Sequence, residues 1–280
     1  MHNIKLWSPN NKNTNLQKFI NQLDTGLNIK NYADLHNWSI KHKNNFWSNV
    51  WDFTNFVGEK KGKIFKSSPE FTKNKFFDEC KINYAENCLT REDDDNAIIF
   101  HSEKKIKRKY SWRELRSAVF KFANYLKNNN IKKNDRIAAI LPNIPETVIS
   151  FLSTAQLGAI WSSCSSDFGK KAIIDRFKQI EPKVLLFSDY YFYNNKKVDT
   201  TKIIKELVYN ISSIEKIILI PYEFNETDYQ LDFEYDNLSN ILKQETEYSK
   251  FEKFNFNHPL YILYSSGTTG VPKCIVHSSG

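Results

Sequence analysis

Short apolar segments alternate with helix-like segments over the second half of the chain, and this alternation strongly limits the possible folds. Each apolar segment has the length and composition of a buried strand. Strands that alternate with helices form βαβ units and a mostly parallel sheet. We therefore predict an α/β protein. The expected strands are residues 136–141, 159–164, 183–188, 216–222 and 259–266, with helices over 146–157, 171–180 and 202–210.

The region before this alternation is rich in aromatic residues and Asn. Between residues 32 and 56, apolar side chains recur at spacings of three and four, which predicts a helix whose aromatic residues pack in a core. Residues 58–75 are polar and are expected to be a loop. The acidic residues of 91–96 indicate a boundary, so we predict a helical region over residues 1–92 and a second domain over 93–280.

A hairpin and a capped helix are predicted at the start of the second domain. Residues 97–100 and 106–110 have the composition of two strands joined by a charged turn. Ser111 and Glu114 form the S-x-x-E pattern of a capping box, and an apolar helical face follows it. Residues 223–257 are polar and are predicted to be irregular.

Charge and cysteine usage argue against several classes of protein. The net charge is +8, but the Lys residues are dispersed and the one dense run, 104–109, fits a solvated hairpin, so we expect no nucleic-acid binding. Cys80, Cys88, Cys164 and Cys274 form no C-x-x-C pair and no zinc-ligand spacing. The N-terminus has no signal-peptide pattern and no apolar run reaches ~20 residues, so we expect no membrane association. Reduced thiols then favour the cytoplasm.

The stretch YSSGTTGVPK, residues 264–273, is the one motif with clear chemical meaning. Glycines let backbone N–H groups approach a ligand, hydroxyls add donors, and a Lys adds a charge suited to phosphate oxygens. The motif is not a Walker A loop, because its spacing differs and Pro272 precedes Lys273. Pro272 and the strand-like residues 274–277 predict a strand–turn–strand arrangement. The alternative is an ordinary Ser- and Gly-rich hairpin turn.

This motif resembles the signature of the adenylate-forming synthetases, which include acyl-CoA synthetases, luciferases and peptide-synthetase adenylation domains. In that family the turn holds the β- and γ-phosphates of ATP. The resemblance therefore implies ATP-binding roles that extend over the whole motif. The matching residues are Ser265, Ser266, Gly267, Thr268, Thr269, Gly270 and Lys273.

Other segments resemble the acetoacetyl-CoA synthetase group in order and spacing: residues 32–53, 82–89, 158–169 and 264–280. The alternative within the family is an acetyl- or propionyl-CoA synthetase. The implied reaction joins acetoacetate to coenzyme A through an acyl-adenylate, with release of AMP and diphosphate. Mg²⁺ is expected to offset the triphosphate charge, and Lys273 to stabilise the leaving pyrophosphate. No general base is assigned, because the attacking group is already a carboxylate.

Members of this family are expected to be more than twice as long as these 280 residues. We therefore expect the chain alone to be inactive, and a separately encoded C-terminal portion is a conceivable partner. A non-catalytic nucleotide-binding fragment is the competing hypothesis.

Several further residues have ordinary interpretations. Ser102 and Lys105 match an S-x-x-K pattern, but its companion motifs are absent. We interpret His258 and His277 as structural side chains. Trp161, Ser162 and Ser163 belong to the predicted strand 159–164, near its carboxyl end, where either core packing or a role beside the substrate is consistent with the sequence.

Overall fold

The computed structural model describes residues 7, 13–23, 26–27, 29–225, 229–245, 250–265 and 270–280. The chain divides into two compact units, Met1–Lys81 and Ile82–Gly280. This division comes earlier in the sequence than the boundary predicted between residues 92 and 93, which stays a prediction about the family's domains. Each unit is described separately below.

The first unit contains helices α1 (Asn15–Gln22), α2 (Tyr32–Lys41) and α3 (Lys43–Phe53). The single helix predicted between residues 32 and 56 is wrong, because the chain changes direction at His42, whose φ and ψ are −119° and 52°. This break lets aromatic residues of both helices reach one core, and the rings of Trp38 and Phe46 meet edge to face at 6.1 Å. The core is formed by four buried side chains: Phe19, Leu23, Leu35 and Trp38.

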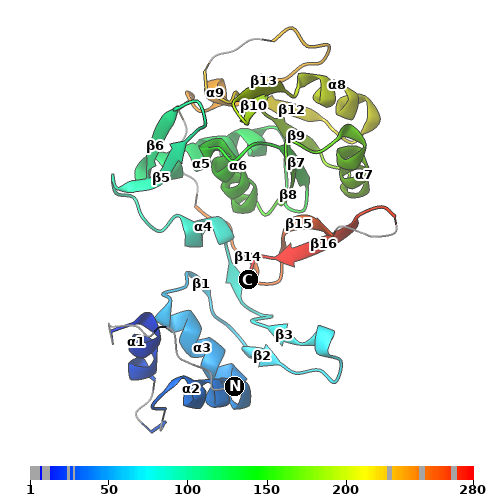
Figure 1. The fold of residues 1–280 in the computed structure, drawn as a ribbon. Helices are drawn as coiled ribbons and strands as arrows, with labels where there is room; N and C mark the ends of the chain where they lie inside the picture. Colours follow the sequence, from blue (N-terminus) through cyan, green and yellow to red (C-terminus); the bar gives the residue numbers. More distant parts are fainter. Residues whose placement is uncertain are drawn as a thin grey trace. The chain divides into compact units, whose positions relative to one another are not determined.

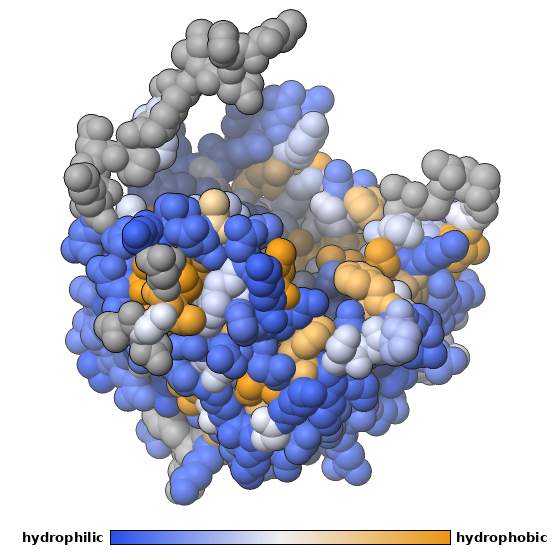
Figure 2. Space-filling view, turned by 90° about the horizontal axis from the view of Figure 1, so that it is seen from below, coloured by the Kyte–Doolittle hydropathy of each residue, from blue (hydrophilic) through white to orange (hydrophobic). Residues whose placement is uncertain are grey.

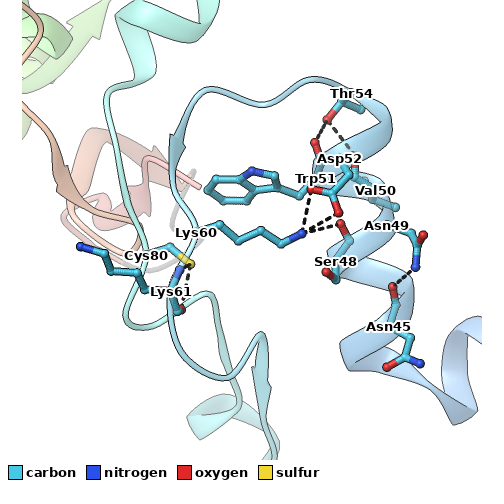
Figure 3. A network of polar contacts seen from close by, with 10 residues as sticks. All are labelled: Asn45, Ser48, Asn49, Val50, Trp51, Asp52, Thr54, Lys60, Lys61 and Cys80. Carbon is cyan, nitrogen blue, oxygen red and sulfur yellow. Dashed lines mark hydrogen bonds and ion pairs between the residues drawn. The ribbon is translucent and has the colours of Figure 1, made fainter.

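The segment after α3 was expected to be a loop, but it contains short regular elements. These are β1 (Gly58–Glu59), β2 (Phe65–Lys66), a 3₁₀ turn (Phe71–Lys73), β3 (Lys75–Phe76) and β4 (Lys81–Ile82). Lys60 secures this segment to α3, because its Nζ contacts the Asp52 carboxylate at 2.7 Å and the Ser48 carbonyl at 3.1 Å (Figure 3). The buried Sγ of Cys80 lies 3.3 Å from the backbone nitrogen of Lys61.

The second unit is built on a mostly parallel sheet, as predicted (Figure 1). Within the described residues its strands follow the order β13-β12-β9-β7-β8-β15-β16. Only β16 runs antiparallel to its neighbour. The bounds are β7 (Arg136–Ile140), β8 (Ile160–Cys164), β9 (Val184–Phe187), β12 (Lys216–Leu219), β13 (Asp236–Asn237), β15 (Pro259–Ser265) and β16 (Lys273–Ser278).

Helices cover both faces of this sheet (Figure 1). On one face lie α5 (Trp112–Asn128) and α6 (Pro145–Gln156), and on the other lie α7 (Lys170–Ile180) and α8 (Thr201–Asn210). Alternate residues of a strand point to opposite faces. In β7, Ile137 therefore packs in the α5 and α6 core and Ile140 in the α7 and α8 core. Burial on both sides explains why β7 and β9 are nearly continuous apolar runs.

The predicted hairpin and capped helix are both present. Strands β5 (Asn96–His101) and β6 (Lys107–Ser111) pair antiparallel, and Ser111 and Glu114 form the capping box that opens α5. The hairpin is joined to the start of α6 by a buried ion pair, in which Arg108 Nη1 lies 2.5 Å from Glu146 Oε1. The Tyr110 hydroxyl donates to the same oxygen at 2.9 Å.

Some short elements of the second unit were not predicted. Strands β10 (Tyr190–Tyr193) and β11 (Lys196–Asp199) form a second hairpin after β9. A five-residue helix, α4 (Tyr84–Cys88), begins after the side chain of Asn83 caps its first turn. Residues 223–257 were predicted to be irregular, but their described part contains β13, α9 (Leu238–Ile241) and β14 (Phe254–Asn255).

Candidate phosphate-binding site

The candidate site lies at the turn between β15 and β16. The two strands expected on either side of this turn are both present, and they pair antiparallel from Pro259 with Ser278 to Ser265 with Lys273. Since Ser265 ends β15 and Lys273 begins β16, the pairing continues to both ends of the turn. The ordinary constraints of a sheet therefore fix where the turn starts and stops.

The structure describes three of the seven predicted site residues. Ser265 is partly exposed and Lys273 is exposed, and they are direct partners across the two strands. Gly270 has a φ of +134°, and no atom lies within 4 Å of the position that a Cβ would take there. The other four, Ser266, Gly267, Thr268 and Thr269, lie outside the described residues. The assignment of all seven to phosphate binding stays a prediction.

The turn follows the carboxyl end of a parallel strand. Strand β15 runs parallel to β8, which runs parallel to β7, so the carboxyl ends of these strands lie at the same edge of the sheet. In open α/β sheets, ligands bind outside the carboxyl ends of the strands. The position of the turn is therefore the position at which this fold class binds its ligands.

Side chains on the α7 face support β15 close to the turn. Ser162 Oγ, which is fully buried, donates to the carbonyl of Ile262 at 2.9 Å and lies 3.0 Å from the Tyr264 hydroxyl oxygen. Burial raises the pKa of Tyr264, so the phenol stays neutral. The Arg176 guanidinium lies 5.7 Å from the centre of the Tyr264 ring. These residues connect β15 to β8 and α7.

Trp161 and Ser162 are core residues in this structure. Trp161 is 6% exposed and lies in the core on the α5 and α6 side, with its ring 5.9 Å from that of Phe151. The sequence was consistent with either core packing or a role beside the substrate, and the structure agrees with core packing for both side chains. Ser163, the third residue of that segment, is partly exposed.

His258 and His277, at the end of the β15–β16 hairpin away from the turn, make structural contacts, as interpreted from the sequence. His258 is buried, with Nε2 2.7 Å from the Gly158 carbonyl oxygen and its ring stacked on Phe254. Burial lowers the pKa of His258. The ring of His277 stacks on Tyr261 at 4.9 Å.

Within the part of the chain that the structure describes, other nucleophiles and metal ligands give no second candidate site. Burial raises the pKa of Cys164 to about 12, so this thiol is protonated near neutral pH. Ser102 and Lys105 belong to the turn of the β5–β6 hairpin, where the Ser102 hydroxyl accepts the backbone N–H of Ile106 at 3.1 Å.

In the described ranges, His, Cys, Asp and Glu side chains form no group of three that could hold a metal ion. None of the helices described is long and apolar enough to cross a membrane.

The sheet and its helices define a nucleotide-binding type of α/β architecture, in which a turn at the carboxyl edge contacts the ligand. The family model for AMP-binding enzymes matches residues 85–280, and the chain therefore belongs to this family. It is 37% identical over 257 residues to acetoacetyl-coenzyme A synthetase of Rhizobium meliloti (strain 1021), and this match covers 91% of the chain. It is also 34% identical to acetoacetyl-CoA synthetase of Xenopus tropicalis, over 98% of the chain.

A solved structure of an acetoacetyl-CoA synthetase is also similar to this chain. The fold is similar to that of acetoacetyl-CoA synthetase from Streptomyces lividans, with a TM-score of 0.86, 31% sequence identity and 96% of this chain covered. The matched region is 39% of the Rhizobium protein, 43% of the Xenopus protein and 42% of the Streptomyces chain. The chain thus spans about two fifths of the length of these relatives.

Sequence reasoning missed the residues that support the turn from α7, namely Arg176 and Gln179. The Gln179 side chain contacts Pro272, which is 93 residues further along the chain. Neither residue belongs to a motif, and on their helix they have the pattern of ordinary exposed polar positions. Only the folded arrangement of α7 beside β15 and β16 identifies them.

Proposed function

We propose that this chain is the phosphate-binding part of an ATP-dependent acid–thiol ligase that forms acetoacetyl-CoA from acetoacetate, ATP and coenzyme A. The observation that carries the proposal is the family's signature motif at the end of two paired strands, on the ligand-binding edge of the sheet. The similarity to acetoacetyl-CoA synthetases over more than nine tenths of the chain supports the choice of acid.

The proposed role of the turn is to hold the β- and γ-phosphates of ATP. Backbone N–H groups and the hydroxyls of Ser265, Ser266, Thr268 and Thr269 would donate to phosphate oxygens, and Gly267 and Gly270 would allow close approach. Lys273 would supply a positive charge, and none of the described acidic side chains forms an ion pair with it. The carboxylate of the acid would then attack the α-phosphate while these donors stabilise the departing pyrophosphate.

Mg²⁺ is proposed to enter with the nucleotide. The triphosphate oxygens would provide some of its ligands and water molecules others, as is common for this ion. Its chemistry would be to neutralise the charge of the triphosphate. In the same proposal, residues 1–92 are the family's N-terminal helical region, residues 93–280 are the first part of its AMP-binding domain, and the reaction takes place in the cytoplasm.

The direct test is nucleotide binding by the purified chain, measured by calorimetry with ATP and Mg²⁺. We expect Lys273→Ala to weaken binding by about tenfold or more, because a charge-assisted contact to phosphate contributes about 1.5–3 kcal/mol. Lys178→Ala is the matched control, since it removes an exposed Lys from α7 that is not part of the turn. Equal loss of affinity in both variants would contradict a specific role for Lys273.

A second measurement tests the reaction itself. The chain is incubated with ATP, Mg²⁺, acetoacetate and coenzyme A, and AMP is quantified. AMP that forms only when acetoacetate is present supports the ligase assignment, and acetate and propionate in place of acetoacetate test the choice of acid. Because the chain alone is expected to be inactive, we expect ATP binding without AMP formation, which supports the phosphate-binding role. AMP formation would contradict the expected inactivity.

A further inference from the structure

Gln179, in the last turn of α7, contacts the strand that leaves the candidate turn. Its Nε2 donates to the carbonyl of Pro272 at 2.9 Å and to the carbonyl of Asp175, one helical turn back, at 2.7 Å. Its Oε1 lies 3.7 Å from Cys274 Sγ. Both the nitrogen and the oxygen of this exposed amide thus have partners. Two of the three partner residues, Pro272 and Cys274, flank Lys273.

The same helix contacts the strand that enters the turn. Arg176, three residues before Gln179, places its guanidinium over the ring of Tyr264 and 4.9 Å from the centre of the Phe168 ring. Tyr264 is the direct strand partner of Cys274. Helix α7 therefore contacts both strands of the hairpin at the Tyr264–Cys274 pair. This pair is next to the Ser265–Lys273 pair that borders the turn.

The direction of the Pro272 carbonyl group affects the backbone orientation of Lys273. A peptide bond is planar, so fixing the direction of this C=O also fixes the N–H of Lys273 and the line to its Cα. The proline ring restricts φ on the other side. Because neighbouring strand residues point to opposite faces, Cys274 faces α7 while Lys273 points to the other face of the hairpin.

We propose that Gln179 is a positioning residue for the phosphate-binding turn. By holding the Pro272–Lys273 peptide, it directs the Lys273 ammonium group toward the phosphates that the turn binds. This inference rests on the proposed function, and it adds a helix-borne residue that is outside the signature motif. Gln179 itself does not touch the nucleotide.

The experiment measures binding of inorganic tripolyphosphate with Mg²⁺ to the whole chain, by calorimetry. Gln179→Met keeps the length of the side chain but removes both hydrogen-bonding groups, and we expect about five- to tenfold weaker binding, the effect of one hydrogen bond. Gln179→Ala is a second variant for the same measurement. Asn210→Leu is the matched control, because Asn210 is an exposed amide at the end of α8 that donates to the Glu206 carbonyl at 2.8 Å and is not part of the turn.

A double-mutant cycle separates positioning from a general structural effect. If Gln179 acts through Lys273, then Gln179→Met will have little further effect on tripolyphosphate binding once Lys273→Ala is present. A merely structural role would weaken binding by the same factor in both backgrounds, and that result would overturn the inference. Equal affinity of the wild type and Gln179→Met would also overturn it while leaving the proposed function intact. Failure of the wild type to bind tripolyphosphate would overturn both.

Discussion

Glu146 brings a negative charge into the interior of the second unit. Its side chain is fully buried, and it is paired with Arg108 and accepts a hydrogen bond from Tyr110. The Arg108 guanidinium also lies 5.2 Å from the centre of the Phe100 ring. A buried carboxylate is tolerable only when its charge and oxygen atoms have such partners.

Removing one member of this pair leaves an uncompensated buried charge. We expect Arg108→Met to lower the free energy of unfolding by about 3–5 kcal/mol, measured by urea denaturation. Arg113→Met is the control, because the pair of Arg113 with Asp94 is largely exposed and such pairs contribute about 1 kcal/mol or less. A similar small effect for both variants would show that the Glu146 charge is not effectively buried.

His258 makes stability depend on pH. Burial lowers its pKa from the usual 6.5, so the unfolded chain binds a proton more readily than the folded chain. The contribution to stability is therefore complete above pH 6.5 and is lost as the pH falls through the lower folded-state pKa. We expect the free energy of unfolding to decrease between about pH 7.5 and about pH 5.5, and to decrease less in His258→Asn.

The exposed histidine His36 provides the comparison for this measurement. In His36→Asn the change in unfolding free energy between the two pH values should match that of the wild type. A His258→Asn variant with the wild-type pH dependence would show that other groups cause it.

At the scale of elements, the connection from α6 to β8 depends on a left-handed glycine. Gly158 has a φ of +65°, and a Cβ at this position would lie 2.7 Å from the Phe254 ring. We expect Gly158→Ala to destabilise the chain by about 1–3 kcal/mol, because both backbone strain and a steric clash are introduced. Thermal unfolding measures this change.

Gly169 offers a contrasting substitution just before α7. No atom lies within 4 Å of its Cβ position and its φ is negative, so Gly169→Ala should leave the melting temperature unchanged or slightly higher. If the two alanine variants melted alike, the close approach of Phe254 would have no energetic effect.

The regular elements were predictable wherever a local pattern determines them. Strands β7, β9 and β12 are apolar runs, and the capping box of α5 has a fixed spacing, so these elements were found from the sequence, whereas the polar strand β13 was not. The break between α2 and α3 was not, because His42 is neither Gly nor Pro and interrupts no apolar spacing. The β10–β11 hairpin had a signal that was overlooked: Asn194 and Asn195 both adopt positive φ, which Asn favours in tight hairpin turns.

The candidate site was predictable only in part for a similar reason. Its motif is a local pattern next to β15 and is visible in the sequence, while the phosphate-binding role of its residues stays a prediction. Gln179 and Arg176 contact Pro272 and Tyr264, which lie far away in the sequence. Contacts of this kind are created by the packing of α7 on the sheet, and no periodicity within α7 specifies them.

At the scale of the whole molecule, exposed hydrophobic residues are found among the hydrophilic ones, as on the face drawn in Figure 2. Three of the exposed hydrophobic side chains belong to the two strands of the hairpin: Leu263, Ile275 and Val276 are 45%, 45% and 57% exposed. Strand β16 is also the last strand of the sheet in the part of the chain that the structure describes. An apolar strand at a sheet edge favours pairing with another chain.

We therefore expect the purified chain to associate as its concentration rises, and Val276→Lys to reduce this association. A charge on an edge strand opposes pairing between edges. Light scattering over a concentration series measures the effect. Val148→Lys is the control, because Val148 is 38% exposed on α6 and away from the sheet edge, so it should change scattering less.

The pairing of Ser265 with Lys273 also allows the sequence of the turn to evolve independently of the stability of the sheet. Because the strands stay in register up to both ends of the turn, residues within the turn can be replaced, added or removed without shifting β15 against β16. Under the proposed function, selection can thus alter how tightly the turn holds phosphate while the sheet keeps its folding free energy.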